Sequence, residues 1–220
     1  KAVMKYLSEH KSKSIYFSLN EEQNDGCFYS DGEVVFRTNG KENFRCSRND
    51  INIRGEHNLA NAMSVICAAK VFNLDNAGIV QGLQTFESVE HRLELVREIN
   101  SVKYVNDSKA TNVDSVWYAL KSFDEPILLI LGGQDKGNDY EQIKDLVIQK
   151  VKKIYAIGSS AEKVFSFFHK DVKVEIEKSL EDAVKKSSRE TQKGDVVLLS
   201  PACASFDMFN NYEHRGKVFK

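Results

Sequence analysis

A regular alternation of strand-like and helix-like segments, from residue 89 to the end of the chain, constrains the fold more than any other feature. Five short runs rich in leucine or β-branched residues predict strands at 102–105, 127–131, 153–157, 172–176 and 196–199. Between them, apolar residues at helical spacing predict helices at 113–122, 140–147, 161–168 and 180–191. This order predicts an α/β domain with a Rossmann-like, open and mostly parallel sheet that is covered by helices on both faces.

The first 88 residues follow a different pattern, in which short strands come first and helices follow. Strands are expected at 14–17, 27–30, 33–36 and 43–46, and Asp31-Gly32 and Asn39-Gly40 favour hairpin turns because both pairs adopt positive φ at low cost. Apolar residues at helical spacing then predict one helix from Leu59, Ala62, Met63, Ile66 and Ala69, and a second at 77–86. We therefore divide the chain into residues 1–88, an incomplete α/β segment with short β hairpins, and residues 89–220, a nearly complete α/β domain.

Charge and hydropathy argue against several classes of function. The 31 basic and 32 acidic residues are interspersed and give a formal net charge of -1, so neither a nucleic-acid partner nor an anionic membrane surface is expected. The longest apolar runs have the length of strands and are too short to span a bilayer. Four cysteines, at positions 27, 46, 67 and 203, are far apart and lack a C-x-x-C pair, which favours reduced thiols in a cytoplasmic protein over disulfides or a metal site.

The segment 38–41, with the sequence TNGK, has some features of a phosphate-binding loop. Such a loop cradles phosphates with backbone amides and a lysine, but it also needs earlier glycines, a following Ser or Thr, and a helix behind it. Here Glu42 follows and the flanks are strand-like. We therefore interpret 38–41 as a hairpin turn with a charged tip.

Three polar segments come at the ends of predicted strands: 106–112 (NDSKATN), 132–137 (GGQDKG) and 199–207 (LSPACASFD). Because ligands of open parallel sheets bind beyond the carboxyl ends of the strands, these segments are expected to border a ligand crevice. Asp107 and Lys109 would place an acid and a cation there, and the helix start behind them favours anions. The alternative is an elaborate helix cap formed by Thr111 or Asn112.

The other two segments carry candidate anion contacts. Lys136 is either a plain exposed lysine or an anion ligand, and the Ser205 hydroxyl can hydrogen-bond a carboxylate. Cys203 lies among alanines and has no histidine nearby in the sequence, so we expect a small buried side chain and not a nucleophile.

Two further polar clusters lie outside these segments. Segment 55–62 (GEHNLANA) opens the first predicted helix, where Asn58 could serve as a cap and Asn61 could present its amide to a flat heterocycle. His91-Arg92 precedes the first predicted strand of the second domain. Arg92 is either a surface ion-pair partner or a bidentate phosphate ligand.

Six segments follow one another in the chain: GEHNxxN, HR, NDSKATN, GGQDK, LSPACASFD and RG. In the order of these segments the chain resembles the Mur ligase family, whose members join amino acids to the UDP-linked muramyl precursor of peptidoglycan. These segments cover most of residues 55–216. NDSKATN and SPACASFD are similar to the members that add D-glutamate. The resemblance implies an ATP-dependent amide ligase that uses Mg²⁺, with UDP-N-acetylmuramoyl-L-alanine, D-glutamate and ATP as partners, and a monomer in the cytoplasm.

The same resemblance implies roles for single residues. Asn61 is expected to contact adenine and Asp107 the ribose. Arg92 is expected near the phosphates and Lys109 at the phosphates or the acyl phosphate, and both would act in catalysis. The D-glutamate pocket is expected to comprise Thr111, Lys136, Ser205 and Phe206.

The resemblance also implies that residues 1–88 end the family's central ATP-binding domain and that residues 89–220 form its C-terminal domain. The phosphate-binding loop, the magnesium ligands and a carbamylated lysine would then lie upstream, so this chain alone is expected to hold no metal and to show no ligase turnover. Two alternatives are a different Mur-type or folylpolyglutamate-type ligase, and a non-catalytic α/β domain that binds a nucleotide or an amino acid.

Overall fold

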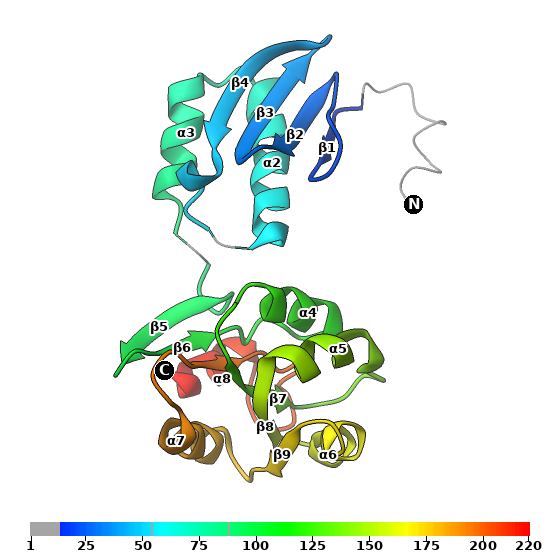
Figure 1. The fold of residues 1–220 in the computed structure, drawn as a ribbon, viewed down its shortest axis with the longest axis vertical. Helices are drawn as coiled ribbons and strands as arrows, with labels where there is room; N and C mark the ends of the chain where they lie inside the picture. The colour runs from blue at the N-terminus through cyan, green and yellow to red at the C-terminus, as the bar shows by residue number, and fades with distance from the viewer. Residues whose placement is uncertain (1–13, 54, 88) are drawn as a thin grey trace. The chain divides into compact units, whose positions relative to one another are not determined.

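The computed structural model describes residues 14–53, 55–87 and 89–220, and the chain divides into two compact units, Lys1–Glu87 and Ser88–Lys220 (Figure 1). We call them the amino-terminal and the carboxyl-terminal unit. Ser88, at the predicted domain boundary, lies outside the described residues. Neither unit contains, in its described part, a helix that is long and apolar enough to cross a membrane.

A four-stranded sheet and two helices make up the amino-terminal unit. Across the sheet, the strands follow the order β1 (Tyr16–Ser18), β2 (Gly26–Ser30), β3 (Glu33–Thr38) and β4 (Lys41–Ser47). A 3-10 turn, η1 (Arg48–Asp50), leads to α2 (Glu56–Val71) and α3 (Asn76–Thr85). The five apolar residues that predicted the first helix are all buried in α2, where they face a core shared with the sheet.

The two predicted hairpin turns of this unit are confirmed. Asp31-Gly32 joins β2 to β3 and Asn39-Gly40 joins β3 to β4, and both strand pairs are antiparallel. All four turn residues have positive φ, between 49° and 81°, as a two-residue hairpin turn requires. The segment 38–41 is therefore a hairpin turn and not a phosphate-binding loop. β1 differs from the hairpins, because it pairs with β2 in parallel.

Three of the four cysteines, although distant in the sequence, meet in the core of the amino-terminal unit. Cys27 from β2, Cys46 from β4 and Cys67 from α2 all belong to one apolar cluster. All four cysteines are free thiols and buried, as the prediction of reduced thiols required.

A six-stranded sheet organises the carboxyl-terminal unit, and the predicted α/β fold with a mostly parallel sheet is confirmed. Its strands follow the order β5 (Glu94–Ile99), β6 (Val102–Asn106), β10 (Val196–Leu199), β7 (Ile127–Gly132), β8 (Val151–Ile157) and β9 (Lys173–Ile176). All neighbours pair in parallel except β5, which is antiparallel to β6. β5 is the strand that the sequence pattern did not predict, because its edge position leaves most of its side chains partly or fully exposed.

Helices cover both faces of this sheet. One face packs against α4 (Val113–Lys121), α5 (Glu141–Lys150) and α6 (Ala161–Phe168), and the other against α7 (Leu180–Glu190) and α8 (Tyr212–Phe219). Figure 1 shows α4 and α5 on the side of the sheet opposite to α7. The central strand β7 is buried on both sides: Ile127, Leu129 and Leu131 face the first layer, whereas Leu128 and Ile130 face the second.

Strand order determines which loops meet. β10 lies between β6 and β7, and Leu199 at its end is paired with Asn106 on one side and Ile130 on the other. Because the three strands are parallel, the segments that follow them lie at one edge of the sheet. β5 runs the opposite way, and Glu94 at its start is paired with Asn106, so the residues just before β5 join the same edge.

Candidate active site

Four segments, 91–93, 106–112, 132–137 and 200–207, lie at this edge, which we call the carboxyl edge. Backbone hydrogen bonds join them directly. The Asp107 amide donates to Leu199 O at 2.8 Å, the Gln134 amide donates to Ala204 O at 2.9 Å, and the Lys109 amide donates to His91 O at 3.0 Å. Seven of the eight residues predicted to act on ligands therefore belong to one contiguous edge of the carboxyl-terminal unit.

Asp107 is the acid of the carboxyl edge, and it is 7% exposed. The Ser200 hydroxyl donates to its Oδ2 at 2.8 Å, and the Leu93 amide donates to its Oδ1 at 3.2 Å. Burial raises the pKa of Asp107 to about 7, although these two hydrogen bonds and the charge of Arg92 act in the opposite direction. The carboxyl group therefore titrates near neutral pH.

Arg92 and Lys109 are two cations close to Asp107 in the chain: Arg92 precedes Leu93, whose amide donates to Asp107, and Lys109 follows Asp107 by two residues. Arg92 is exposed and lies between His91 and Leu93, whose φ angles of 67° and 43° are in the left-handed region. Lys109 is half-buried, and its Nζ lies 3.7 Å from the centre of the Tyr212 ring. The electrostatic attraction between this ammonium group and the ring face holds Lys109 in place.

The alternative of a helix cap is correct for one residue of segment 106–112. Asn112 caps α4, because its Oδ1 accepts a hydrogen bond from the Ser115 amide at 2.8 Å. Asp107 and Lys109 take no part in this cap. Thr111 is half-buried, and its amide donates to Lys109 O at 2.8 Å.

The segments after β7 and β10 approach each other closely. Gly133 has φ of 139°, and a Cβ there would lie 2.5 Å from Ala204 O, so only glycine fits. Lys136 is exposed, Ser205 is 2% exposed, and Phe206 is 67% exposed. The structure thus places Lys136 and Ser205 on neighbouring segments, while the Phe206 ring projects into solvent.

Cys203 is a buried thiol, as its sequence context predicted. Three polar groups surround its Sγ: Asn138 Nδ2 at 3.1 Å, Ser160 Oγ at 3.5 Å and Tyr140 Oη at 3.8 Å. Burial raises the pKa of the thiol, which opposes formation of the nucleophilic thiolate.

Arg215 is a central residue of the carboxyl edge that the sequence indicated only as part of the RG segment. It is 0% exposed in α8, and burial lowers its pKa to about 10, so it stays protonated at neutral pH. Its guanidinium donates to Ser108 O at 2.8 Å and Ser108 Oγ at 2.9 Å, and also to Cys203 O at 3.1 Å and Ala204 O at 3.3 Å. One side chain therefore ties the segment after β6 to the segment after β10.

Asn61, the predicted adenine contact, belongs to the amino-terminal unit. It is exposed on α2, and its backbone carbonyl accepts a hydrogen bond from the Ser64 hydroxyl at 2.7 Å. The side-chain amide of Asn61 is therefore accessible to a ligand on the exposed face of α2.

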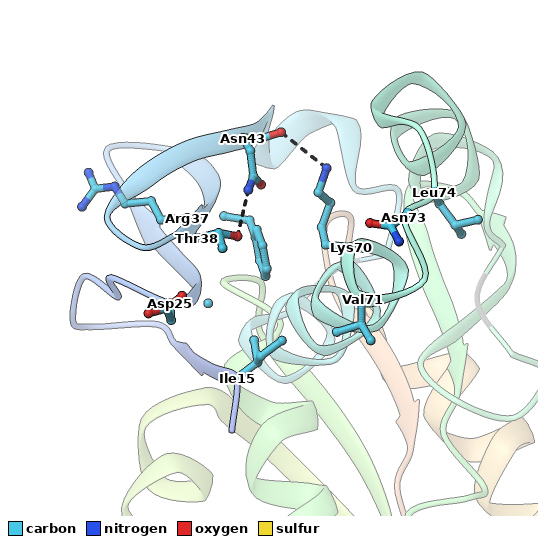
Figure 2. A pocket seen from close by; sticks show the side chains of 11 residues that line it. Ile15, Asp25, Arg37, Thr38, Asn43, Lys70, Val71, Asn73 and Leu74 are labelled. Carbon is cyan, nitrogen blue, oxygen red and sulfur yellow. Dashed lines mark hydrogen bonds between the residues drawn. The ribbon is translucent and has the colours of Figure 1, made fainter. Parts of the chain in front are cut away.

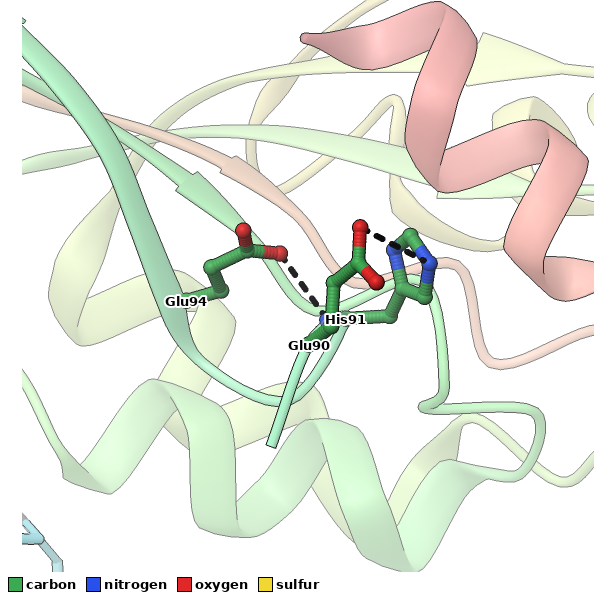
Figure 3. Close-up of side chains that lie close together, drawn as sticks. All are labelled: Glu90, His91 and Glu94. Atoms are coloured by element: carbon green, nitrogen blue, oxygen red, sulfur yellow. Dashed lines mark hydrogen bonds and ion pairs between the residues drawn. The ribbon is translucent and has the colours of Figure 1, made fainter. Parts of the chain in front are cut away.

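Glu90, His91 and Glu94 bring three potential metal ligands within 4.8 Å of one another (Figure 3). A cation of the protein already lies among them, because Lys220 Nζ is 2.7 Å from Glu90 Oε1 and 2.7 Å from Glu94 Oε1. The geometry is that of an ion-pair cluster around an ammonium group, and we do not assign a metal to it.

A cavity of about 410 Å³ lies in the amino-terminal unit (Figure 2). Asn43 connects two of its walls. The backbone carbonyl of Asn43 accepts a hydrogen bond from Lys70 Nζ at 3.5 Å, and its side-chain Nδ2 donates to Thr38 Oγ1 at 2.9 Å. None of the residues predicted to bind ligands lines this cavity. It is therefore separate from the carboxyl edge.

Replacing Gly216 with alanine is expected to destabilise the carboxyl-terminal unit by about 2 kcal/mol, because overpacking a tight contact costs about 1–3 kcal/mol. A Cβ at this position of α8 would overlap His91 Nδ1 and lie 2.7 Å from His91 Cε1 and 3.0 Å from Asn106 Nδ2. Chemical unfolding followed by fluorescence of Trp117, the one tryptophan of the chain, measures the change. Gly82→Ala is the control, since a Cβ there on α3 meets open space; circular dichroism should show a slight stabilisation.

The candidate site is therefore the carboxyl edge of a mostly parallel α/β sheet, and it presents cations, a buried acid and closely joined loops where open α/β sheets bind their ligands. The chain belongs to the Mur ligase family, because residues 91–203 match the family described as Mur ligase, glutamate ligase domain. The resemblance in the sequence segments is thereby confirmed.

Two similar proteins are both named UDP-N-acetylmuramoylalanine--D-glutamate ligase. The protein of Salinibacter ruber is 46% identical over 196 residues, which cover 89% of this chain and 43% of the relative. The protein of Chloroherpeton thalassium is 44% identical over 210 residues, which cover 94% and 45%. The chain thus spans about half the length of the curated relatives it matches.

Solved structures share the fold at low sequence identity. The UDP-N-acetylmuramate-alanine ligase MurC of Thermotoga maritima has a TM-score of 0.63 at 16% identity, with 85% of this chain and 41% of that chain covered. The folylpolyglutamate synthase of Mycobacterium tuberculosis has a TM-score of 0.61 at 16% identity, with 86% and 46% covered. These likenesses concern the fold alone.

Proposed function

We propose that this chain is part of an ATP-dependent ligase that adds D-glutamate to UDP-N-acetylmuramoyl-L-alanine. The observation that carries the proposal is the carboxyl edge, where the cations Arg92, Lys109 and Lys136 and the buried acid Asp107 lie on segments joined by backbone hydrogen bonds. The names of the similar proteins give the amino acid and the acceptor. The amino-terminal unit would then be the end of the central ATP-binding domain, and the carboxyl-terminal unit the ligase domain that follows it.

In the proposed reaction, ATP phosphorylates the carboxylate of UDP-N-acetylmuramoyl-L-alanine, and the amine of D-glutamate attacks the acyl phosphate. An amide, ADP and phosphate are the products. The chain contributes by binding and orientation, because a phosphoryl transfer is accelerated mainly by positioning and by cations at the developing charge. Arg92 and Lys109 would hold the phosphates, Asn61 the adenine and Asp107 the ribose.

The D-glutamate pocket would consist of Thr111, Lys136, Ser205 and Phe206. Lys136 and Ser205 suit the two carboxylates of the amino acid, since one is a mobile cation and the other a hydroxyl donor. The ring of Phe206, being exposed, is free to cover a bound ligand.

Asp107, Glu90 and Glu94 do not suit Mg²⁺. Both oxygens of Asp107 accept hydrogen bonds, and Glu90 and Glu94 are paired with Lys220. Mg²⁺ prefers oxygen ligands in open octahedral geometry, so we propose that its protein ligands come from outside this chain. The four buried, reduced thiols agree with a cytoplasmic enzyme, and we propose that it acts as a monomer on these small-molecule substrates.

Phosphate release by the full-length ligase that contains this chain tests the proposal. Release should require both UDP-N-acetylmuramoyl-L-alanine and D-glutamate, and this chain alone should give no turnover. Equal turnover with L-lysine, or with glutamate and a folate acceptor, would identify a different ligase of the fold. Nucleotide binding without any ligase turnover in the full-length protein would support a non-catalytic domain.

Replacing Lys136 with alanine in the full-length ligase is expected to raise the KM for D-glutamate about 30-fold, because a charge-assisted contact is worth about 2 kcal/mol. The KM for ATP should stay nearly constant. Lys170→Ala is the matched control, since Lys170 is an exposed lysine of the same unit outside the carboxyl edge. A parallel rise of both KM values in the Lys136 variant would assign Lys136 to the nucleotide or to folding.

A further inference from the structure

We propose that Glu94 is the positioning residue that holds Arg92 at the carboxyl edge, an inference that rests on the proposed function of Arg92 as a phosphate ligand. Glu94 begins β5, two residues after Arg92, and does not itself belong to the segments that would contact substrate. It acts through hydrogen bonds to the residue before Arg92 and to the neighbouring strand.

The carboxylate of Glu94 accepts from two sides. Its Oε2 accepts a hydrogen bond from the His91 amide at 2.9 Å (Figure 3) and another from Asn106 Nδ2 at 3.1 Å. Its Oε1 is paired with Lys220 Nζ at 2.7 Å. One acid thus connects the turn before β5, the end of β6 and the residue that follows α8.

The turn around Arg92 needs such support because its backbone is strained. His91 and Leu93 both have positive φ. For a residue other than glycine this conformation is unfavourable in free energy unless surrounding contacts stabilise it. The surrounding bonds fix the turn: Asn106 Nδ2 lies 2.9 Å from His91 Nδ1, and the Leu93 amide donates to Asp107 Oδ1 at 3.2 Å. Arg92 is exposed, so the contacts of its two neighbours determine where its guanidinium can reach.

The same turn reaches the second cation. The His91 carbonyl accepts from the Lys109 amide at 3.0 Å, so a displacement of His91 would also disturb the backbone of Lys109. His91 is itself 2% exposed, and within the described residues its Nε2 has no hydrogen-bond partner. The Glu90 carboxylate lies 3.7 Å from this nitrogen, beyond hydrogen-bond distance (Figure 3). The ring is therefore held by packing, by Asn106 and by this longer contact, and the backbone of the turn by Glu94.

A double-mutant cycle in the full-length ligase tests the proposal. Glu94→Ala is expected to lower kcat/KM for ATP about 100-fold, since a misplacement of about 1 Å can have that effect. Added to Arg92→Ala, the same change should lower kcat/KM by no more than about tenfold, because only its effect through Lys109 remains. Multiplied effects of the two substitutions would overturn the proposal.

Two conservative variants separate the bonds of Glu94. Glu94→Gln keeps an oxygen for His91 and Asn106 but loses the ion pair with Lys220, and it should restore most of the activity. Glu90→Gln removes the other carboxylate paired with Lys220 without touching these bonds, and it should leave kcat/KM unchanged. A Glu94→Gln variant as impaired as Glu94→Ala would show that the charge, and not the hydrogen bonds, is what matters.

Amide hydrogen exchange gives a readout that is independent of the reaction. In Glu94→Ala, the amides of His91 and Lys109 should exchange at least about tenfold faster, while those of β7 stay protected. Unchanged exchange at His91 would overturn the proposal. Faster exchange together with an Arg92→Ala variant of normal activity would instead show that the proposed function of Arg92 is wrong.

Discussion

Replacing Arg215 with methionine is expected to lower the free energy of unfolding of the carboxyl-terminal unit by about 4 kcal/mol. The guanidinium is fully buried and donates to three backbone carbonyls and one hydroxyl. Methionine fills a similar volume but leaves these acceptors without a donor, and each buried unsatisfied acceptor costs about 1–3 kcal/mol. Relief of the desolvated charge offsets part of that loss.

Urea unfolding followed by Trp117 fluorescence measures this change. The tryptophan packs against the core of the carboxyl-terminal unit and so reports on that unit. Arg97→Met is the matched control: Arg97 is exposed and donates to Lys220 O, and its loss should change stability by less than about 0.5 kcal/mol. Equal, small changes in both variants would show that Arg215 does not hold the two segments together.

Between pH 4 and 7, Asp107 is expected to make the carboxyl-terminal unit progressively less stable, by about 4 kcal/mol in total. Burial raises its pKa from 3.8 to about 7 in the folded protein. In this window the folded state holds a proton that the unfolded state has released, so rising pH favours unfolding. Below pH 4 both states are protonated, and above pH 7 both are ionised.

Asp107→Asn isolates this contribution from those of other groups. The amide cannot ionise, so the variant should match the parent chain near pH 4 and exceed its stability by several kcal/mol at pH 8, as urea unfolding at both pH values would show. Ser200→Ala provides a second arm: its hydroxyl lowers the pKa of Asp107, and its removal should extend the loss of stability to higher pH. A parent and an Asp107→Asn variant that differ equally at all pH values would contradict the assignment.

Local patterns predicted most elements of this chain because those elements have a clear inner face. β7 is buried on both sides and reads as an unbroken apolar run, and α2 repeats its buried residues at helical spacing. The turns at Asp31-Gly32 and Asn39-Gly40 were predictable because their residue types tolerate positive φ. β5 lacks such a signal, since it lies at the sheet edge and joins β6 through Asn100-Ser101 without a glycine.

The sequence predicted the polar residues of the candidate site, but not the buried arginine that joins its segments. Asp107, Lys109 and Lys136 are polar residues directly after apolar strands, a position that indicates a ligand crevice whatever the order of the strands. Arg215 gave no comparable signal, because a charged residue in a helix is normally exposed. Its burial depends on carbonyl groups of Ser108, Cys203 and Ala204, which become its neighbours only after folding.

The sequence by itself determined the alternation of strands and helices, and the resemblance of its polar segments assigned the family. Only the tertiary structure decided that β10, the last strand in the chain, lies between β6 and β7, so that Ser200 reaches Asp107 across 93 residues. The physical reason is that hydrophobic periodicity indicates which side chains of a single segment are buried. Strand order depends instead on which long-range pairing of strands buries the apolar faces of all the helices and strands at once.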